Sequence, residues 1–150
     1  MSNAPTDIAN LLYTYARLID SGDYAGIGRL FAHARLTADQ SDMDVRGADA
    51  IEAHYARTTR VYPDTNTPKT KHVMTNPIIE VDEAAGTATC HAYYTVFQAT
   101  EQLPLQPIIT GRYEDRFERV DGRWRYTEKK FFVDQVGDLS QHLLPASALR

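Results

Sequence analysis

Cysteine is almost missing from this chain of 150 residues. Cys90 is the only one, so no disulfide bond can form within the chain. Small secreted scaffolds are commonly held together by several disulfides. The cysteine content therefore gives no support for a secreted scaffold of that kind.

Long apolar segments are missing as well. No run of apolar residues approaches the roughly 18 that a membrane-spanning helix requires. Residues 1–7 contain neither the basic segment nor the apolar segment of a signal peptide. We therefore expect a cytoplasmic protein that does not have a membrane as its partner.

Positive charge is in short supply. The chain has 16 lysine and arginine residues against 20 aspartate and glutamate residues, which gives a net charge of -4. Nucleic acids and anionic surfaces are bound through basic patches. We therefore expect no nucleic-acid partner.

The spacing patterns of metal and phosphate sites are also absent. The histidines are scattered, with no His-x-His or His-Glu-x-x-His spacing, and they are His33, His54, His72, His91 and His142. The sequence contains no glycine-rich phosphate loop and no nucleophile elbow. We therefore expect neither a metal nor a cofactor.

Helical patterns come first along the chain and strand patterns follow. Apolar spacing predicts helices over about 6–19, 23–31 and 47–60, and strands over 35–39, 71–81, 87–99, 108–120 and 123–133. Helices followed by strands indicate an α+β protein. The length fits a single domain over 1–150, with its core over about 6–134 and a tail, 135–150, that is not assigned.

The strand predicted over 108–120 shows the clearest alternation. Tyr113, Asp115 and Phe117 fall on one face with Gly111, whereas the residues between them are mostly charged. Charged side chains belong in water, so the first set faces the interior. Asp115 is then an acid on an apolar inner face, and such a residue needs a partner.

Other strand residues are candidates for the same interior. Aromatic side chains and methionine at strand spacing either fill a core or line a ligand cavity, and the sequence leaves both alternatives open. Asn76 can instead satisfy backbone groups near Pro77. The candidates for ligand contact are Met74, Asn76, His91, Tyr93, Phe97, Tyr113, Phe117 and Glu128.

Four passages together resemble the SnoaL-like branch of the nuclear transport factor 2-like superfamily. They are residues 15–23 with 30–32, residues 46–51, residues 71–79, and residues 111–117 with 121–126. The resemblance implies a cone-shaped α+β barrel, in which three or four helices pack on a curved mixed sheet and enclose a pocket. It also implies a small-molecule ligand in that pocket and a homodimer formed through the outer face of the sheet.

Asp20 and His72 stand where scytalone dehydratase-like members of this superfamily pair an aspartate with a histidine. A carboxylate that accepts one imidazole N–H leaves the other ring nitrogen free to move a proton. The alternative is that Asp20 bonds nearby backbone while His72 is a satisfied core residue. The dehydratase pattern has a second histidine and an asparagine, where this chain has Phe97 or Gln98 and Tyr113.

Tyr15, Asp39 and Asp115 form a second candidate set, which is similar to that of ketosteroid isomerase. The resemblance gives Tyr15 and Asp115 the role of binding an enolate oxygen and Asp39 the role of moving the proton. An apolar site can keep a carboxylic acid neutral so that it donates a hydrogen bond, as it does in that isomerase. The alternative places Tyr15 in the core, Asp39 in a solvated acidic loop, and Asp115 beside a basic residue.

These residues predict a small cofactor-free lyase or isomerase that acts by general acid and base chemistry on a small, cyclic, partly apolar substrate. The alternative is a non-catalytic protein, either one that binds a ligand or an assembly subunit resembling the small subunit of ring-hydroxylating dioxygenases. An open pocket with polar groups favours the enzyme. A filled interior and a large exposed apolar patch favour the subunit.

Overall fold

The computed structural model describes residues 3–147. Its elements in chain order are α1 (Ala4–Asp20), α2 (Tyr24–Leu30), β1 (Arg35–Ala38), β2 (Asp44–Arg46), α3 (Ala48–Thr58), β3 (Thr70–Asp82), β4 (Thr87–Gln98), β5 (Gln106–Val120) and β6 (Arg123–Val136). The predicted helices and strands are all present. The three-residue strand β2 was not predicted, and β6 continues three residues beyond its predicted end.

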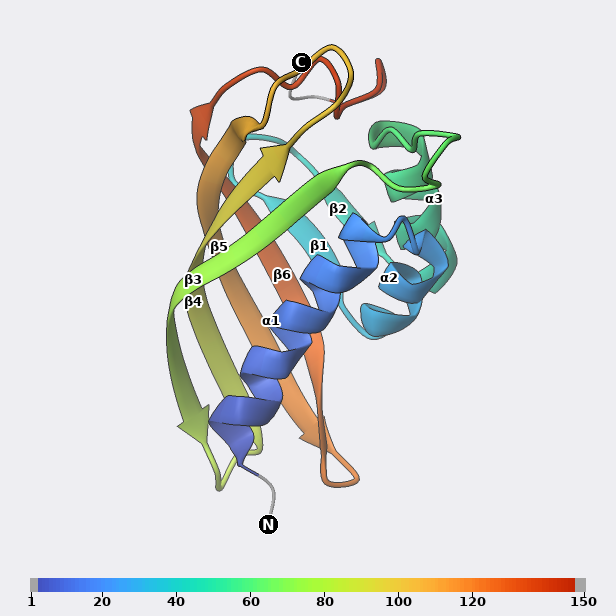
Figure 1. The fold of residues 1–150 in the computed structure, drawn as a ribbon. Coiled ribbons are helices and arrows are strands. Elements are labelled where there is room, and N and C mark those ends of the chain that lie inside the picture. Colours follow the sequence, from blue (N-terminus) through green and yellow to red (C-terminus); the bar gives the residue numbers. More distant parts are fainter. Residues whose placement is uncertain (1–2, 148–150) are drawn as a thin grey trace.

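The strands form one mixed sheet in the order β2-β1-β6-β5-β4-β3. The four long strands form antiparallel pairs, while β1 runs parallel to β6. Figure 1 shows the long strands curving around α1, with α2 and α3 at one end of the molecule. The predicted curved mixed sheet with three helices is confirmed, but β2 and β3 are free edges, so the sheet does not close into a barrel.

Helix α1 has one apolar face because its buried residues are spaced three or four apart. Ile8, Leu12 and Tyr15 are among them, and this spacing places them on the same side of a helix. The side chain of Asn3 caps the first turn by accepting a hydrogen bond from the backbone of Thr6 at 3.2 Å. The helix therefore lies along the sheet and brings its last residue to the start of β3.

The inner face of β4 is the opposite of the one predicted. His91 and Tyr93 are exposed on the outer face, and Phe97 is half-buried there, so the placement of these three residues in the interior is wrong. The buried residues that form the inner face are Ala88, Cys90, Ala92, Tyr94, Val96 and Gln98.

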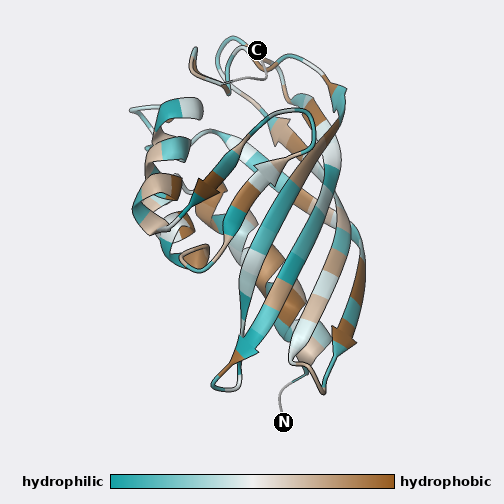
Figure 2. Ribbon diagram, turned by 180° about the vertical axis from the view of Figure 1, so that it is seen from behind, coloured by the Kyte–Doolittle hydropathy of each residue, from teal (hydrophilic) through white to brown (hydrophobic). Residues whose placement is uncertain are grey.

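Pairing with β5 fixes this orientation. Ala92 lies opposite Tyr113, and Cys90 lies opposite Asp115; directly opposed residues of an antiparallel pair point to the same side of the sheet. Strand β4 carries aromatic side chains on both faces, so its alternation alone does not identify the inner one. Figure 2 shows the ribbon from the outer side of the sheet, where hydrophilic segments alternate with apolar ones.

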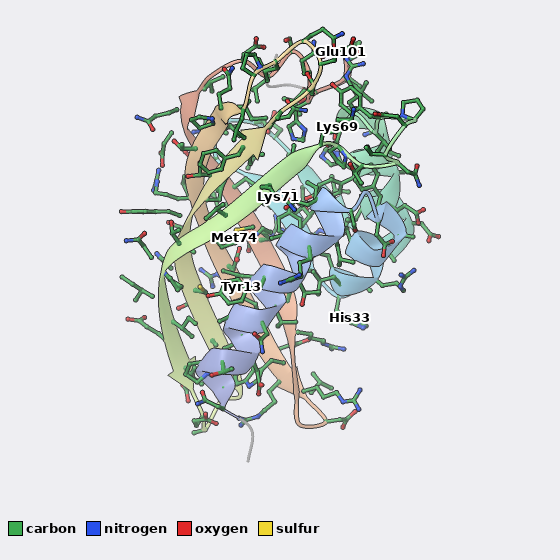
Figure 3. The ribbon with its side chains drawn as sticks, in the orientation of Figure 1. Tyr13, His33, Lys69, Lys71, Met74 and Glu101 are labelled. Atoms are coloured by element: carbon green, nitrogen blue, oxygen red, sulfur yellow. The ribbon has the colours of Figure 1, made fainter. Side chains whose placement is uncertain are left out.

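Strand β3 contains an irregularity that removes one candidate from the interior. Its register with β4 shifts between Thr75 and Ile78, and Asn76 has a positive φ of 53°, which asparagine adopts more readily than most residues. Asn76 is exposed there. Met74, labelled on β3 in Figure 3, is half-buried and packs against the core.

A buried ion pair joins the middle of β5 to β6. Asp115 lies opposite Lys129, and the Lys129 Nζ is 3.1 Å from one carboxylate oxygen of Asp115, with both side chains fully buried. The same Nζ lies 3.3 Å from the ring centre of Tyr113. Burial raises the pKa of Asp115 to about 6, and burial likewise lowers the pKa of Lys129.

Removing one member of this pair should destabilise the protein strongly. Lys129→Met leaves the Asp115 carboxylate buried without a partner, so we expect a loss of about 3–5 kcal/mol in the free energy of unfolding. The double variant Asp115→Leu with Lys129→Met buries no charge, so its free energy of unfolding should be close to that of wild type. Urea unfolding at pH 7 measures both differences.

Lys130→Met is the matched control, because Lys130 contacts Asp39 at 3.5 Å on the partly exposed outer face. Lys130→Met should lower the free energy of unfolding by less than about 1 kcal/mol. Burial raises the pKa of Asp115 above its unfolded value, so the lone acid binds a proton on folding and the penalty of Lys129→Met should shrink as the pH falls from 7 toward 4. If Lys129→Met and Lys130→Met lose equal amounts of unfolding free energy, Lys129 is not the buried partner of Asp115.

Candidate functional site

A cavity of about 310 Å³ lies between the inner face of the sheet and the helices. Its walls come from the second half of α1, β1 with the segment 39–43 after it, the end of α3, and the inner face of β3–β6. The C-terminal segment 137–147, which lies at the top of Figure 1, completes them. Polar side chains on these walls include Tyr15, Tyr55, His72 and His142. The interior is therefore neither filled nor entirely apolar.

Asp20 and His72 are paired at this cavity. The Asp20 Oδ1 lies 2.6 Å from the His72 Nδ1, and the Asp20 Oδ2 accepts the backbone N–H of His72 at 2.8 Å. The hydroxyl of Thr70 donates a third hydrogen bond to Asp20 Oδ1 at 2.9 Å. The side chain of His72 is only 5% exposed, and its ring forms part of the cavity wall.

The carboxylate of Asp20 is held in its charged form. Burial by itself would raise the pKa of Asp20, but the hydrogen bonds and charge of His72, together with the Thr70 hydroxyl, outweigh burial and lower that pKa below its usual value. A charged carboxylate accepts the Nδ1–H of the imidazole, which leaves Nε2 as the nitrogen that can take up a proton. The pair therefore has the geometry of a general base with a fixed tautomer.

A group of tyrosines lies beside the pair. The Tyr15 and Tyr55 hydroxyls are 2.8 Å apart, and the ring of Tyr15 lies 6.2 Å from that of His72 and 6.2 Å from that of Tyr113. Burial raises the pKa of all three tyrosines, so their hydroxyls stay protonated. The Tyr15–Tyr55 bond uses one hydroxyl hydrogen, which leaves the other to donate to a ligand.

His142 enters the cavity from the C-terminal segment. It is 6% exposed, and its ring centre lies 6.3 Å from that of His72. Burial lowers the pKa of His142 to about 3, with the charge of His72 adding to this effect and that of Asp20 opposing it. Among residues 3–147, the His142 Nδ1 has no hydrogen-bond partner.

The second predicted set, Tyr15, Asp39 and Asp115, is not brought together. Tyr15 lines the cavity, whereas Asp39 is exposed beside Lys130. Asp115 does not line the cavity and is paired with Lys129, as the alternative interpretation predicted.

Of the predicted ligand contacts, only Tyr113 lines the cavity. Phe117 is buried farther along the sheet, with its ring 4.5 Å from that of Tyr126. Glu128 is half-buried and accepts a hydrogen bond from Thr37 at 3.0 Å.

Sequence reasoning missed Tyr55, Tyr94 and His142. Tyr55 recurs with Ile51 on the buried side of α3, and this spacing indicates a core residue without showing that the core is hollow. Tyr94 belongs to the face of β4 that was predicted to point outward. His142 lies in a segment without helical or strand periodicity, so no pattern could place it.

The described residues contain neither a cluster of metal ligands nor a membrane-spanning helix. No group of three or more histidine, cysteine, aspartate or glutamate residues within 3–147 is placed to hold a metal ion. No helix in the same range has the length and apolar character needed to cross a membrane.

Solved structures agree with this architecture. A Mycobacterium tuberculosis protein of unknown function has a TM-score of 0.71 and 24% identity over 89% of this chain and 73% of its own. A nuclear transport factor 2-like protein with a cystatin-like fold, from Novosphingobium aromaticivorans, has a TM-score of 0.68 and 20% identity, and the match covers 96% of this chain and 84% of that protein. A putative scytalone dehydratase from the same species has a TM-score of 0.70 and 17% identity, and the match covers 90% of this chain and 87% of that protein.

Sequence comparison identifies the family directly. No curated protein is similar enough to count as a match. The profile of the SnoaL-like domain matches residues 2–130, which covers all three helices and most of the sheet. This protein therefore belongs to the SnoaL-like domain family.

Proposed function

We propose that this protein is a cofactor-free lyase or isomerase that uses general acid and base chemistry on a small, cyclic, partly apolar substrate. The observation that carries this proposal is the 2.6 Å contact between the Asp20 Oδ1 and the His72 Nδ1, made by a histidine whose ring lies on the cavity wall. A base must have both a fixed orientation and access to its substrate; Asp20 orients the His72 ring, and the place of that ring on the cavity wall supports access.

The roles follow from the protonation states. The His72 Nε2 removes a proton from a carbon beside a carbonyl or hydroxyl group, and negative charge then grows on the substrate oxygen. A protonated hydroxyl of the Tyr15–Tyr55 pair donates to that oxygen, which stabilises the charge as it forms. In an isomerase the proton returns to another carbon, whereas in a lyase the hydroxyl leaves with a proton as water.

The cavity also supports an apolar ring in the substrate. Its sheet wall includes Val96, Ile109 and Phe131, and its volume of about 310 Å³ lies at the lower end of the range for small-molecule sites. A neighbouring structure carries the name of a putative scytalone dehydratase, which is a lyase. At 17% identity this neighbour supports the fold, so the argument for chemistry rests on the Asp20–His72 pair.

The non-catalytic alternatives are less well supported. An assembly subunit needs no interior space, yet this chain retains a cavity with polar side chains. A ligand-binding protein without activity accounts for the cavity, but it has no need for a histidine in the cavity wall whose tautomer is fixed by a carboxylate. Measurement of proton transfer separates binding from catalysis.

His72→Phe should abolish proton transfer without closing the cavity. We expect wild-type protein to speed the exchange of the α-protons of 2-tetralone in deuterated buffer, because this exchange requires a base beside a carbonyl. His72→Phe should lower the enzymatic rate by about 10²–10⁴-fold. Asp20→Asn should lower it as well, because the carboxylate no longer fixes the tautomer. Proton NMR follows the exchange.

His91→Phe is the matched control for this measurement. His91 is exposed on the outer face of β4, so its loss should leave the exchange rate unchanged. The proposal fails if His72→Phe exchanges as fast as wild type, or if wild-type protein exchanges no faster than buffer.

The Asp20–His72 pair should also make stability depend on acidic pH. The pKa of Asp20 is lower in the folded protein than its unfolded value of about 3.9. Its contribution is therefore fully present above that value and is lost as the pH falls through the folded pKa. The difference in unfolding free energy between wild type and Asp20→Asn should be large at pH 7, stay nearly constant down to about pH 4, and shrink as the pH falls further toward about 2.

Urea unfolding across this pH range measures the difference. Asp42→Asn is the control, because Asp42 is exposed in the loop before β2 and its loss should matter little at any pH. A difference between wild type and Asp20→Asn that stays constant from pH 7 down to about pH 2 would show that the carboxylate is not held by His72 in solution.

A further inference from the structure

His142 is a buried polar side chain in the cavity for which the proposed mechanism has no use. Its ring is 6% exposed, and among residues 3–147 its Nδ1 has no partner. Buried polar groups are nearly always hydrogen-bonded, so an exception calls for an explanation. A bound ligand that supplies the missing hydrogen bond would account for this one.

The backbone around His142 is held firmly while its side chain is left free. The carbonyl of His142 accepts the N–H of Arg60 at 2.8 Å, and the N–H of Leu144 donates to the carbonyl of Thr58 at 2.9 Å. The carbonyl of Gln141 accepts hydrogen bonds from the Tyr62 hydroxyl at 2.6 Å and from the side chain of Gln98 at 3.1 Å.

These contacts surround His142 on both sides, so the segment has a defined position at the cavity. A ring carried by a firmly held backbone is suited to recognising a ligand, because little side-chain freedom remains to be lost on binding. The His142 ring is therefore a fixed part of the cavity wall.

The ring of His142 lies close to His72, the proposed base. The His142 and His72 rings lie 6.3 Å apart, centre to centre, with their planes inclined by 63°, and both line the cavity. A ligand atom that approaches the His72 Nε2 is thus near His142 as well. The segment that carries His142 lies outside residues 2–130, which the family profile matches.

We propose that His142 is a ligand-binding residue, whose imidazole hydrogen-bonds an oxygen of an uncharged, mainly apolar ligand held against His72. This inference rests on the proposed function and specifies its substrate class: a cyclic molecule with a hydroxyl or carbonyl oxygen. Since burial lowers the pKa of His142 to about 3, the ring is neutral at ordinary pH and offers one donor and one acceptor. A neutral partner suits an uncharged oxygen and gives no charge to hold an anion.

Two probes of nearly equal shape test the proposal. The first is 2-naphthol, which carries a hydroxyl, and the second is 2-methylnaphthalene, which carries a methyl group in its place. Calorimetry gives the dissociation constant of each probe for wild type and for His142→Phe. The ratio of the 2-naphthol constant to the 2-methylnaphthalene constant should rise about five- to tenfold in His142→Phe, which is the value of one neutral hydrogen bond.

His91→Phe is the matched control, because His91 is exposed on the outer face of β4 and does not line the cavity. It should leave the ratio within about twofold of wild type, which is well below the effect of one hydrogen bond. His142→Gln retains a hydrogen-bonding side chain and should keep the ratio closer to wild type than His142→Phe does. If His142→Phe binds neither probe, the ratio in His142→Gln decides the outcome.

The proposal is overturned if the ratio is the same in His142→Phe as in wild type, if His91→Phe changes it equally, or if wild type binds neither probe. The 2-tetralone exchange assay separates this failure from failure of the proposed function. If His72→Phe loses exchange while the probe ratio in His142→Phe is unchanged, His72 keeps its role as the base and His142 is not a ligand contact. If the probe ratio changes in His142→Phe but wild type catalyses no exchange, His142 is a ligand contact and the proposed catalytic function of the protein is wrong.

Discussion

The attachment of α1 to the start of β3 is the constraint on which the site depends. Asp20 ends the helix, and its two carboxylate oxygens accept three hydrogen bonds from Thr70 and His72. A carboxylate withdrawn from water is unfavourable unless its oxygens are satisfied, so the helix end and the strand start hold each other in one arrangement. Tyr15 and Ile19 lie on the same part of α1 and are thereby set against the cavity.

Elements were predicted well because their patterns are local. The apolar spacing of α1 and the alternation of β5 each identify an element and its buried face, and the burial of Tyr113 and Asp115 follows from the second of these. The contact between Asp20 and His72 was anticipated in a different way. The two residues are far apart in sequence, and resemblance to related proteins, rather than periodicity, pointed to their pairing.

The errors have a common physical origin, which is that a face or a loop is defined by what packs against it. Strand β4 has aromatic residues on both sides, and only its pairing with β5 places Tyr94 inside and Tyr93 outside. Asn76 leaves the interior because β3 is irregular at that point. His142 reaches the cavity through backbone contacts with the chain beyond α3, and no local pattern encodes such contacts.

The open sheet has a consequence for how copies of this chain behave in concentrated solution. Unpaired strand edges can recruit a strand from another molecule and so begin aggregation. One edge, β2, is three residues long, and its Asp44 is bound by Arg35 and Arg46. The other edge, β3, is broken by its irregular register next to Pro77, which has no N–H to offer. Both edges are therefore poor templates for a further strand, and the sheet can stay open without inviting strand-by-strand growth.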